Sequence, residues 1–109
     1  MKRYKIYHSN RFDKELVKFD KSFQEWVDKL EDKLIFNPYS GDPLGVKWFR
    51  EKKHGKYRIY FLIYDDLEAV FMVAISDKKD QQIVINTINF LLESFKKEIE
   101  NLVNKDDIT

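Results

Sequence analysis

The chain has 109 residues, the size of one small domain with a modest hydrophobic core. Its 20 Lys and Arg nearly balance its 19 Asp and Glu, so the overall charge gives no argument for a nucleic-acid partner and only a local concentration of charge can. Cysteine is absent, which excludes disulfides and thiolate metal sites, and the two histidines lie far apart in the sequence, so no metal site is expected.

The N-terminal third predicts one strand and two helices. Residues 2–8 alternate as a short strand does. Ser9 is a suitable N-cap for a first helix, and residues 22–25, Ser-Phe-Gln-Glu, form a capping-box pattern that opens a second. Asn37-Pro38 ends the second helix, because proline disfavours helical geometry in the residue before it. Almost no linker separates the two helices, so we expect an antiparallel helical hairpin.

The middle of the chain predicts a small meander of strands. Residues 37–45 hold both prolines and two of the three glycines, and they read as a surface loop rather than a domain boundary. Residues 48–79 follow with three β-rich runs, separated by turn signals at His54-Gly55 and Asp65-Asp66. The third run, residues 69–75, is apolar almost throughout, which is typical of a central strand covered on both faces.

The C-terminal part predicts one helix over residues 79–104, followed by a polar tail at residues 105–109. Its apolar positions advance by three and four residues: Ile85, Ile88, Leu92, Phe95, Ile99 and Leu102. This stripe has two interpretations. It packs on the sheet as ordinary core, or its distal half, residues 95–103, extends beyond the body and binds a partner helix or a second copy. Because the stripe continues past what a small sheet would cover, the second interpretation is favoured.

Positive charge is concentrated at the start of the meander. Between residues 47 and 58 there are six cations, Lys47, Arg50, Lys52, Lys53, Lys56 and Arg58. Only Glu51 opposes them, giving a local charge of +5 (6 − 1) in a chain whose total is +1. Strand Lys and Arg are usually solvated surface charges. The alternative is a functional basic patch on a hairpin.

The order of these elements resembles the RelE/ParE superfamily of toxins from type II toxin–antitoxin systems, with the RelE branch favoured. The matching features run from the first strand to about residue 80. The most specific are Phe-Arg-Glu-Lys at 49–52, the Gly55 turn, Lys-Tyr-Arg-Ile-Tyr at 56–60, and residues 70–79. The resemblance implies a single α+β domain over residues 1–109, with a twisted antiparallel sheet of about four strands packed against the helical hairpin.

For the RelE branch, the resemblance implies metal-independent cleavage of mRNA in the ribosomal A site, where the ribose 2′-hydroxyl attacks the adjacent phosphate. This chemistry needs a base, an acid and cations at the phosphorus, and no cofactor. Matching the motifs gives Arg50, Lys52, Arg58 and Lys78 as catalytic residues and Lys47, Lys53, His54, Lys56 and Lys79 as nucleic-acid-binding residues. Arg58 is assigned to the scissile phosphate and Lys52 to proton transfer, with Arg50 and Arg58 beside it to favour its neutral form.

The resemblance also implies partners: a cognate antitoxin, with a heterotetramer as one form of the complex, and the ribosome with its mRNA. No apolar run approaches the roughly 18 residues of a membrane span and no signal peptide opens the chain, so a cytoplasmic protein without membrane contact is expected.

One departure from the RelE pattern keeps two alternatives open. RelE enzymes carry a tyrosine early in the C-terminal segment, whereas residues 81–84 here are Gln-Gln-Ile-Val, and His54 is the imidazole nearest in sequence that can stand in as acid. The missing tyrosine and the near-neutral charge favour a ParE-like toxin that inhibits DNA gyrase and cleaves nothing. The third interpretation is a catalytically decayed member kept for its interactions.

Overall fold

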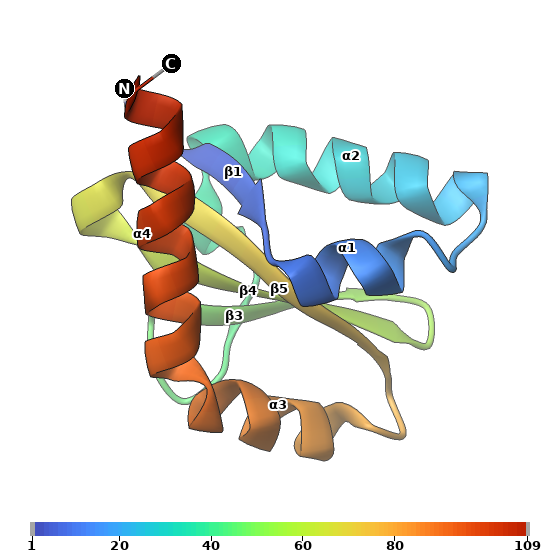
Figure 1. Ribbon diagram of the computed structural model, residues 1–109. Coiled ribbons are helices and arrows are strands. Elements are labelled where there is room, and N and C mark those ends of the chain that lie inside the picture. The colour runs from blue at the N-terminus through green and yellow to red at the C-terminus, as the bar shows by residue number, and fades with distance from the viewer. Residues whose placement is uncertain (1, 109) are drawn as a thin grey trace.

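The computed structural model describes residues 2–108, which form a five-stranded sheet covered by helices on both faces (Figure 1). In chain order the elements are β1 (Lys5–His8), α1 (Asn10–Leu16), α2 (Lys21–Phe36), β2 (Asp42–Pro43), β3 (Phe49–His54), β4 (Tyr57–Tyr64), β5 (Ala69–Asp77), α3 (Gln81–Phe90) and α4 (Leu92–Ile108). Two short 3-10 helices, Pro38–Ser40 and Asp65–Leu67, lie in the connections. No helix within residues 2–108 is both long enough and apolar enough to cross a membrane.

The strand order is β1-β5-β4-β3-β2, and the pairs from β2 to β5 are antiparallel. This confirms the α+β class and the meander of three strands. The first strand joins the sheet as a parallel neighbour of β5, with Lys5 opposite Ala69. The remaining strand, β2, has two residues and was not predicted. It pairs with Arg50 and Glu51, so within residues 2–108 no strand lies on the outer side of residues 52–54 of β3.

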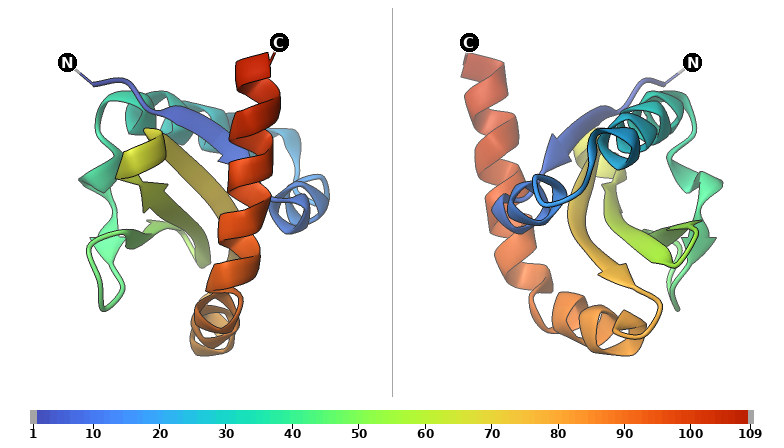
Figure 2. Two further views of the ribbon diagram at one scale, coloured as in Figure 1. Left: turned by 60° about the vertical axis from the view of Figure 1, so that its left-hand side comes forward. Right: turned by 90° about the vertical axis from the view of Figure 1, so that its right-hand side faces the viewer.

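Two hydrophobic clusters hold the layers together, one on each face of the sheet. On the face that we call the α2 face, Val27 and Leu34 of α2 pack against Ile59 and Phe61 of β4. On the opposite, α4 face, residues of α3 and α4 pack against the other side of the same strands: Val84, Ile88, Phe95 and Ile99 against Tyr60, Leu62 and Phe71. The right-hand view of Figure 2 shows α2, in teal, above the strands and α3, in orange, below them, on opposite sides of the sheet. Burial of both faces explains why β5 is almost entirely apolar.

The helix starts follow local capping rules, with one correction. Ser9 caps α1 as predicted, its Oγ accepting a hydrogen bond from Phe12 N at 3.0 Å. The predicted capping box at Ser22 is wrong: the N-cap is Asp20, two residues earlier, and its Oδ1 accepts from Phe23 N at 2.9 Å. The ring of Phe19 stacks on Phe23 with centroids 4.1 Å apart, which fixes the entry of the chain and makes Asp20 the cap.

The predicted C-terminal helix of residues 79–104 is two helices, α3 and α4, which meet at Leu91 and turn sharply there (Figure 1). The break lets the apolar stripe follow one face of a short sheet instead of running past it. Residues 105–108, predicted as a polar tail, are the last turn of α4, and residue 109 lies outside the described residues.

The interpretation of residues 95–103 as a free partner-binding stripe is also wrong. Phe95 and Ile99 are 5% and 0% exposed, and Leu102 and Val103 pack against the same cluster. The end of α4 is further held by Asp106, whose Oδ2 accepts from Lys5 Nζ at 2.9 Å and from the Tyr7 hydroxyl at 2.8 Å. The stripe is therefore core, and β1 fastens the helix that carries it.

Candidate nucleic-acid interface at the β3–β4 hairpin

The basic segment folds as the β3–β4 hairpin with a two-residue turn, Gly55-Lys56. His54 pairs with Tyr57 across this turn, one residue later than the sequence predicted. Gly55 has a φ of +59°, a left-handed conformation that glycine adopts without steric cost. This register pairs Lys52 with Ile59 and Lys53 with Arg58.

The register divides the predicted site residues between the two faces of the sheet. Successive strand residues point to opposite faces, and Ile59 belongs to the α2-face cluster while Tyr60 belongs to the α4-face cluster. Arg50, Lys52 and His54 therefore lie on the α2 side, and Lys53 and Arg58 on the α4 side. The expectation that Arg58 stands beside Lys52 is wrong.

Arg58 is held in a buried position by its own hairpin. The residue is 7% exposed, and its Nη1 donates to the carbonyl oxygens of Gly55 at 3.1 Å and Tyr57 at 3.0 Å. Its Nε is buried and has no hydrogen-bond partner among residues 2–108. An unsatisfied buried donor is costly, more so on a charged group. An anion that reached this guanidinium would supply the missing partner through a charge-assisted hydrogen bond.

Buried polar side chains surround Arg58 on the α4 side, and sequence reasoning did not assign them to the site. The hydroxyls of Tyr60 and Ser76 are hydrogen-bonded at 2.8 Å, and Glu51 Oε1 accepts from Gln81 Nε2 at 2.6 Å. Burial raises the pKa of Tyr60, with a smaller contribution in the same direction from Glu51. Tyr60 is fully buried, so its ring belongs to the core. Strand alternation, which puts residues 51, 58 and 60 on one face, is the signal that could have found this cluster.

The two lysines after β5 reach the same end of the sheet. Arg58 pairs with Ser76 in the β4–β5 register, and Lys78 N donates to Lys56 O at 2.7 Å. A hollow of about 430 Å³ is lined by Lys56, Asp77, Lys78 and Lys79. The structure thus brings the basic turn and the Lys78-Lys79 segment together near Arg58, as the sequence predicted.

Two other predicted residues make contacts that anchor a loop. Arg50 Nε donates to Gly41 O at 3.0 Å and its Nη1 donates to Lys47 O at 2.8 Å. Arg50 and Lys47 also lie over the ring of Tyr39, at 5.4 and 4.7 Å from its centroid. These contacts fasten residues 39–47 to β3 and engage two of the Arg50 guanidinium nitrogens.

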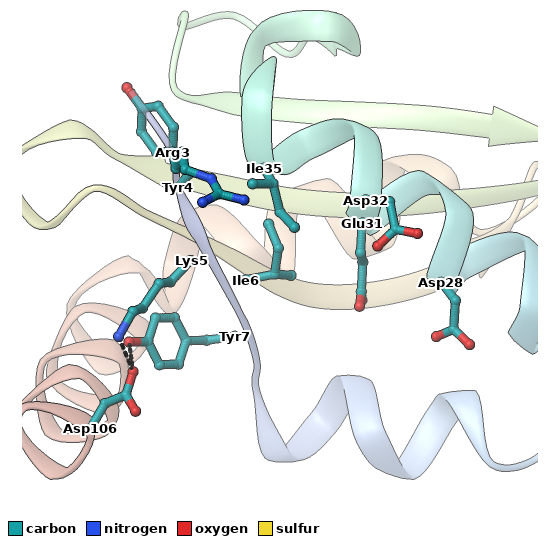
Figure 3. A pocket seen from close by; sticks show the side chains of 10 residues that line it. All are labelled: Arg3, Tyr4, Lys5, Ile6, Tyr7, Asp28, Glu31, Asp32, Ile35 and Asp106. Atoms are coloured by element: carbon teal, nitrogen blue, oxygen red, sulfur yellow. Dashed lines mark hydrogen bonds and ion pairs between the residues drawn. The ribbon is translucent and has the colours of Figure 1, made fainter. Parts of the chain in front are cut away.

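A second hollow, of about 660 Å³, lies between β1 and α2 and is lined by none of the predicted site residues (Figure 3). Its α2 wall carries three carboxylates, Asp28, Glu31 and Asp32. On its β1 side, Lys5 and Tyr7 turn toward Asp106 of α4. Carboxylates repel phosphates, so this hollow is not a nucleic-acid site.

Next to this hollow, His8 joins three elements and predicts a pH dependence of stability. Its Nδ1 lies 2.7 Å from Asp13 Oδ1 of α1, and its Nε2 lies 2.5 Å from Glu31 Oε2 of α2. Burial disfavours the charged ring, but the hydrogen bonds and charges of Glu31 and Asp13 outweigh it and raise the pKa of His8 above its usual 6.5.

A group with a raised folded-state pKa contributes stability that is complete below its unfolded pKa and is lost as the pH rises through the folded value. The free energy of unfolding of the native chain should therefore exceed that of His8→Gln most at about pH 5.5 and least at about pH 8.5. Urea unfolding of both proteins across this range checks the prediction. A constant difference would show that His8 keeps one protonation state throughout.

Among solved structures, the fold is similar to that of an arginine double mutant of the E. coli toxin RelE in the free state. The match has 16% identity and a TM-score of 0.70, and it covers 82% of this chain and 98% of that one. The RelBE2 toxin–antitoxin complex of Mycobacterium tuberculosis matches at 20% identity and TM-score 0.62 over 71% of this chain and 93% of the other.

The archaeal RelE–RelB complex of Pyrococcus horikoshii matches at 14% identity and TM-score 0.60, over 69% and 94% of the two chains. No model of a protein family matches the sequence, and comparison with curated proteins gives no significant match. These likenesses show that the chain has the fold of RelE toxins, as the sequence resemblance implied.

Proposed function

We propose that the chain is the toxin of a type II toxin–antitoxin system and that it cleaves mRNA on the ribosome. The observation that carries this proposal is Arg58, a buried guanidinium with an unpartnered Nε, placed at the basic end of a RelE-like sheet. Cations around it, Lys53, Lys56, Lys78 and Lys79, supply the positive potential that a phosphodiester requires.

In this proposal Arg58 binds a non-bridging oxygen of the scissile phosphate and stabilises the charge that develops as the 2′-hydroxyl attacks. A prepositioned donor of this kind contributes about 10²- to 10³-fold in rate. We assign proton transfer to Lys53 or Lys78 and not to Lys52, which lies on the opposite face. Lys53 lies on the same face as Arg58, and Lys78 lies at the same end of the sheet. The ribosome contributes the positioning of the mRNA.

We also propose a cognate antitoxin as the partner that neutralises the chain, with a heterotetramer as one form of the complex. Support comes from the neighbours in the comparison, which include toxin–antitoxin complexes from a bacterium and an archaeon.

One observation favours the second candidate, a ParE-like gyrase inhibitor or a decayed member. The predicted catalytic cations are not assembled on one face, because Lys52 lies opposite Arg58 and Arg50 is engaged by Gly41 and Lys47. A protein inhibitor of gyrase needs no such assembly.

Primer extension on cellular mRNA after brief induction separates these functions. The proposed nuclease should produce new 5′ ends within codons, only on translated messages. A message whose start codon has been removed is the matched control and should stay intact. Growth arrest with intact messages and raised DNA-damage signalling would instead support the gyrase-type function, and no arrest at all would support the decayed member.

A further inference from the structure

A third hollow lies on the α2 face, away from Arg58. This α2 groove, of about 730 Å³, is bounded by α2 on one side and β3 on the other, with Trp26 and Phe36 among its lining residues. Its volume is in the range that accommodates a ligand of nucleotide size.

The walls of the α2 groove are basic. Lys29 and Lys33 are one helical turn apart on the same side of α2, and Lys52 faces them from β3, while Asp32 is the one acid in the lining. In the described part of the chain, none of the three lysines forms an ion pair with a carboxylate. Their charges are therefore available to an anionic ligand.

Beside the α2 groove, its lining residue Trp26 forms an aromatic platform with His54, which lines a neighbouring hollow. The rings of Trp26 and His54 stack with centroids 4.1 Å apart and an interplanar angle of 22°. Phe23 supports Trp26 from the core at 6.0 Å, and His54 is exposed to solvent. Aromatic faces beside lysines are the combination with which proteins bind single-stranded nucleic acid.

The free edge of β3 connects this groove with the Arg58 face. Lys52 belongs to the groove and Lys53 pairs with Arg58, so consecutive residues lead from one face to the other. Because β2 ends opposite Glu51, no strand among the described residues covers the outer side of residues 52–54. The division of the basic residues between two faces then suits one strand of RNA that crosses this edge.

We propose that the α2 groove binds a single-stranded segment of the RNA substrate next to the segment held at Arg58, with a base on the Trp26–His54 platform and phosphates on Lys29, Lys33 and Lys52. This inference rests on the proposed function in taking RNA as the ligand. The inference adds a second RNA-binding site to the proposed function, on the face of the sheet opposite Arg58.

Trp26 allows a direct test, because the chain has two tryptophans and Trp48→Phe leaves it as the only one. The full-length Trp48→Phe protein is titrated with a 2′-O-methyl oligoribonucleotide, which cannot undergo 2′-hydroxyl attack, so that binding is read without cleavage. Saturable quenching of Trp26 fluorescence is expected. Lys29→Glu with Lys33→Glu should lower the affinity about tenfold and flatten the dependence of log K on log salt by about 0.7 per lysine.

A matched control carries the same charge change on exposed positions of α4, Lys97→Glu with Lys105→Glu, and should bind like the parent. Thermal melts establish that each variant is folded. If Trp26 fluorescence were not quenched, or if both pairs of substitutions weakened oligoribonucleotide binding equally, the proposed RNA site in the α2 groove would be wrong. Neither result bears on the proposed cleavage, which primer extension tests separately. Conversely, binding in the groove without any mRNA cleavage in cells would contradict the proposed nuclease function and leave the RNA site standing.

Discussion

Replacement of Arg58 by alanine is expected to abolish the growth arrest and reduce mRNA cleavage by about 10²- to 10³-fold, since it removes the donor assigned to the scissile phosphate. The fold should survive. Alanine loses two hydrogen bonds to hairpin carbonyls, each worth about 1.5–3 kcal/mol because the donor is charged, but it also removes the cost of a buried Nε that has no partner among the described residues. Primer extension on induced cells and a thermal melt of the purified protein measure the two effects separately.

Two further variants test whether the loss of mRNA cleavage comes from the Arg58 guanidinium itself. Arg58→Lys keeps the charge but loses the fork of donors, so it should restore part of the cleavage and no more. Arg11→Ala removes an arginine from α1, where it lies 3.6 Å from Glu15, and should leave cleavage unchanged. A folded Arg58→Ala protein that still arrests growth would remove Arg58 from the chemistry and, with it, the main support for the nuclease.

The face on which Arg58 lies could have been predicted from the sequence. In a hairpin with a two-residue turn, even-numbered residues of one strand pair with odd-numbered residues of the other. Arg58 pairs with Lys53 in the observed turn and would pair with Glu51 if the turn were His54-Gly55, so in neither case can it share a face with Arg50 or Lys52. The resemblance to the family assigned these cations to one catalytic site, whereas the two-residue turn places Arg58 on the opposite face of the sheet from Arg50 and Lys52.

Other features of the fold could not be predicted from local sequence patterns. The parallel pairing of β1 with β5 joins residues more than 60 positions apart, and the periodicity of residues 2–8 is the same in either strand direction. The apolar stripe of the C-terminal segment keeps its spacing through the break at Leu91, so periodicity alone predicted one helix. The Glu51–Gln81 hydrogen bond depends on where α3 docks, which only packing decides.

Replacement of Phe95 is expected to have the largest effect on stability, because the break at Leu91 places this side chain of α4 against the sheet. Phe95 is 5% exposed and meets Phe71 edge to face, with centroids 6.1 Å apart. Phe95→Ala should lower the free energy of unfolding by about 3–5 kcal/mol, because it removes buried apolar surface and leaves a cavity between α4 and the sheet. Domains of this size are stable by about 5–15 kcal/mol. The variant should therefore lose a large part of the stability of the domain.

Phe90→Ala is the matched control, since Phe90 lies five residues earlier, at the end of α3, and is 87% exposed. It should change stability by less than about 0.5 kcal/mol. Urea unfolding followed by far-UV circular dichroism compares the two variants. If both substitutions cost equally little, α4 would be only loosely docked in solution, and residues 95–103 would again be available as a surface for a partner helix. A large cost confined to Phe95 would mean that any partner of this toxin-like fold must bind elsewhere or displace α4 against that same free energy.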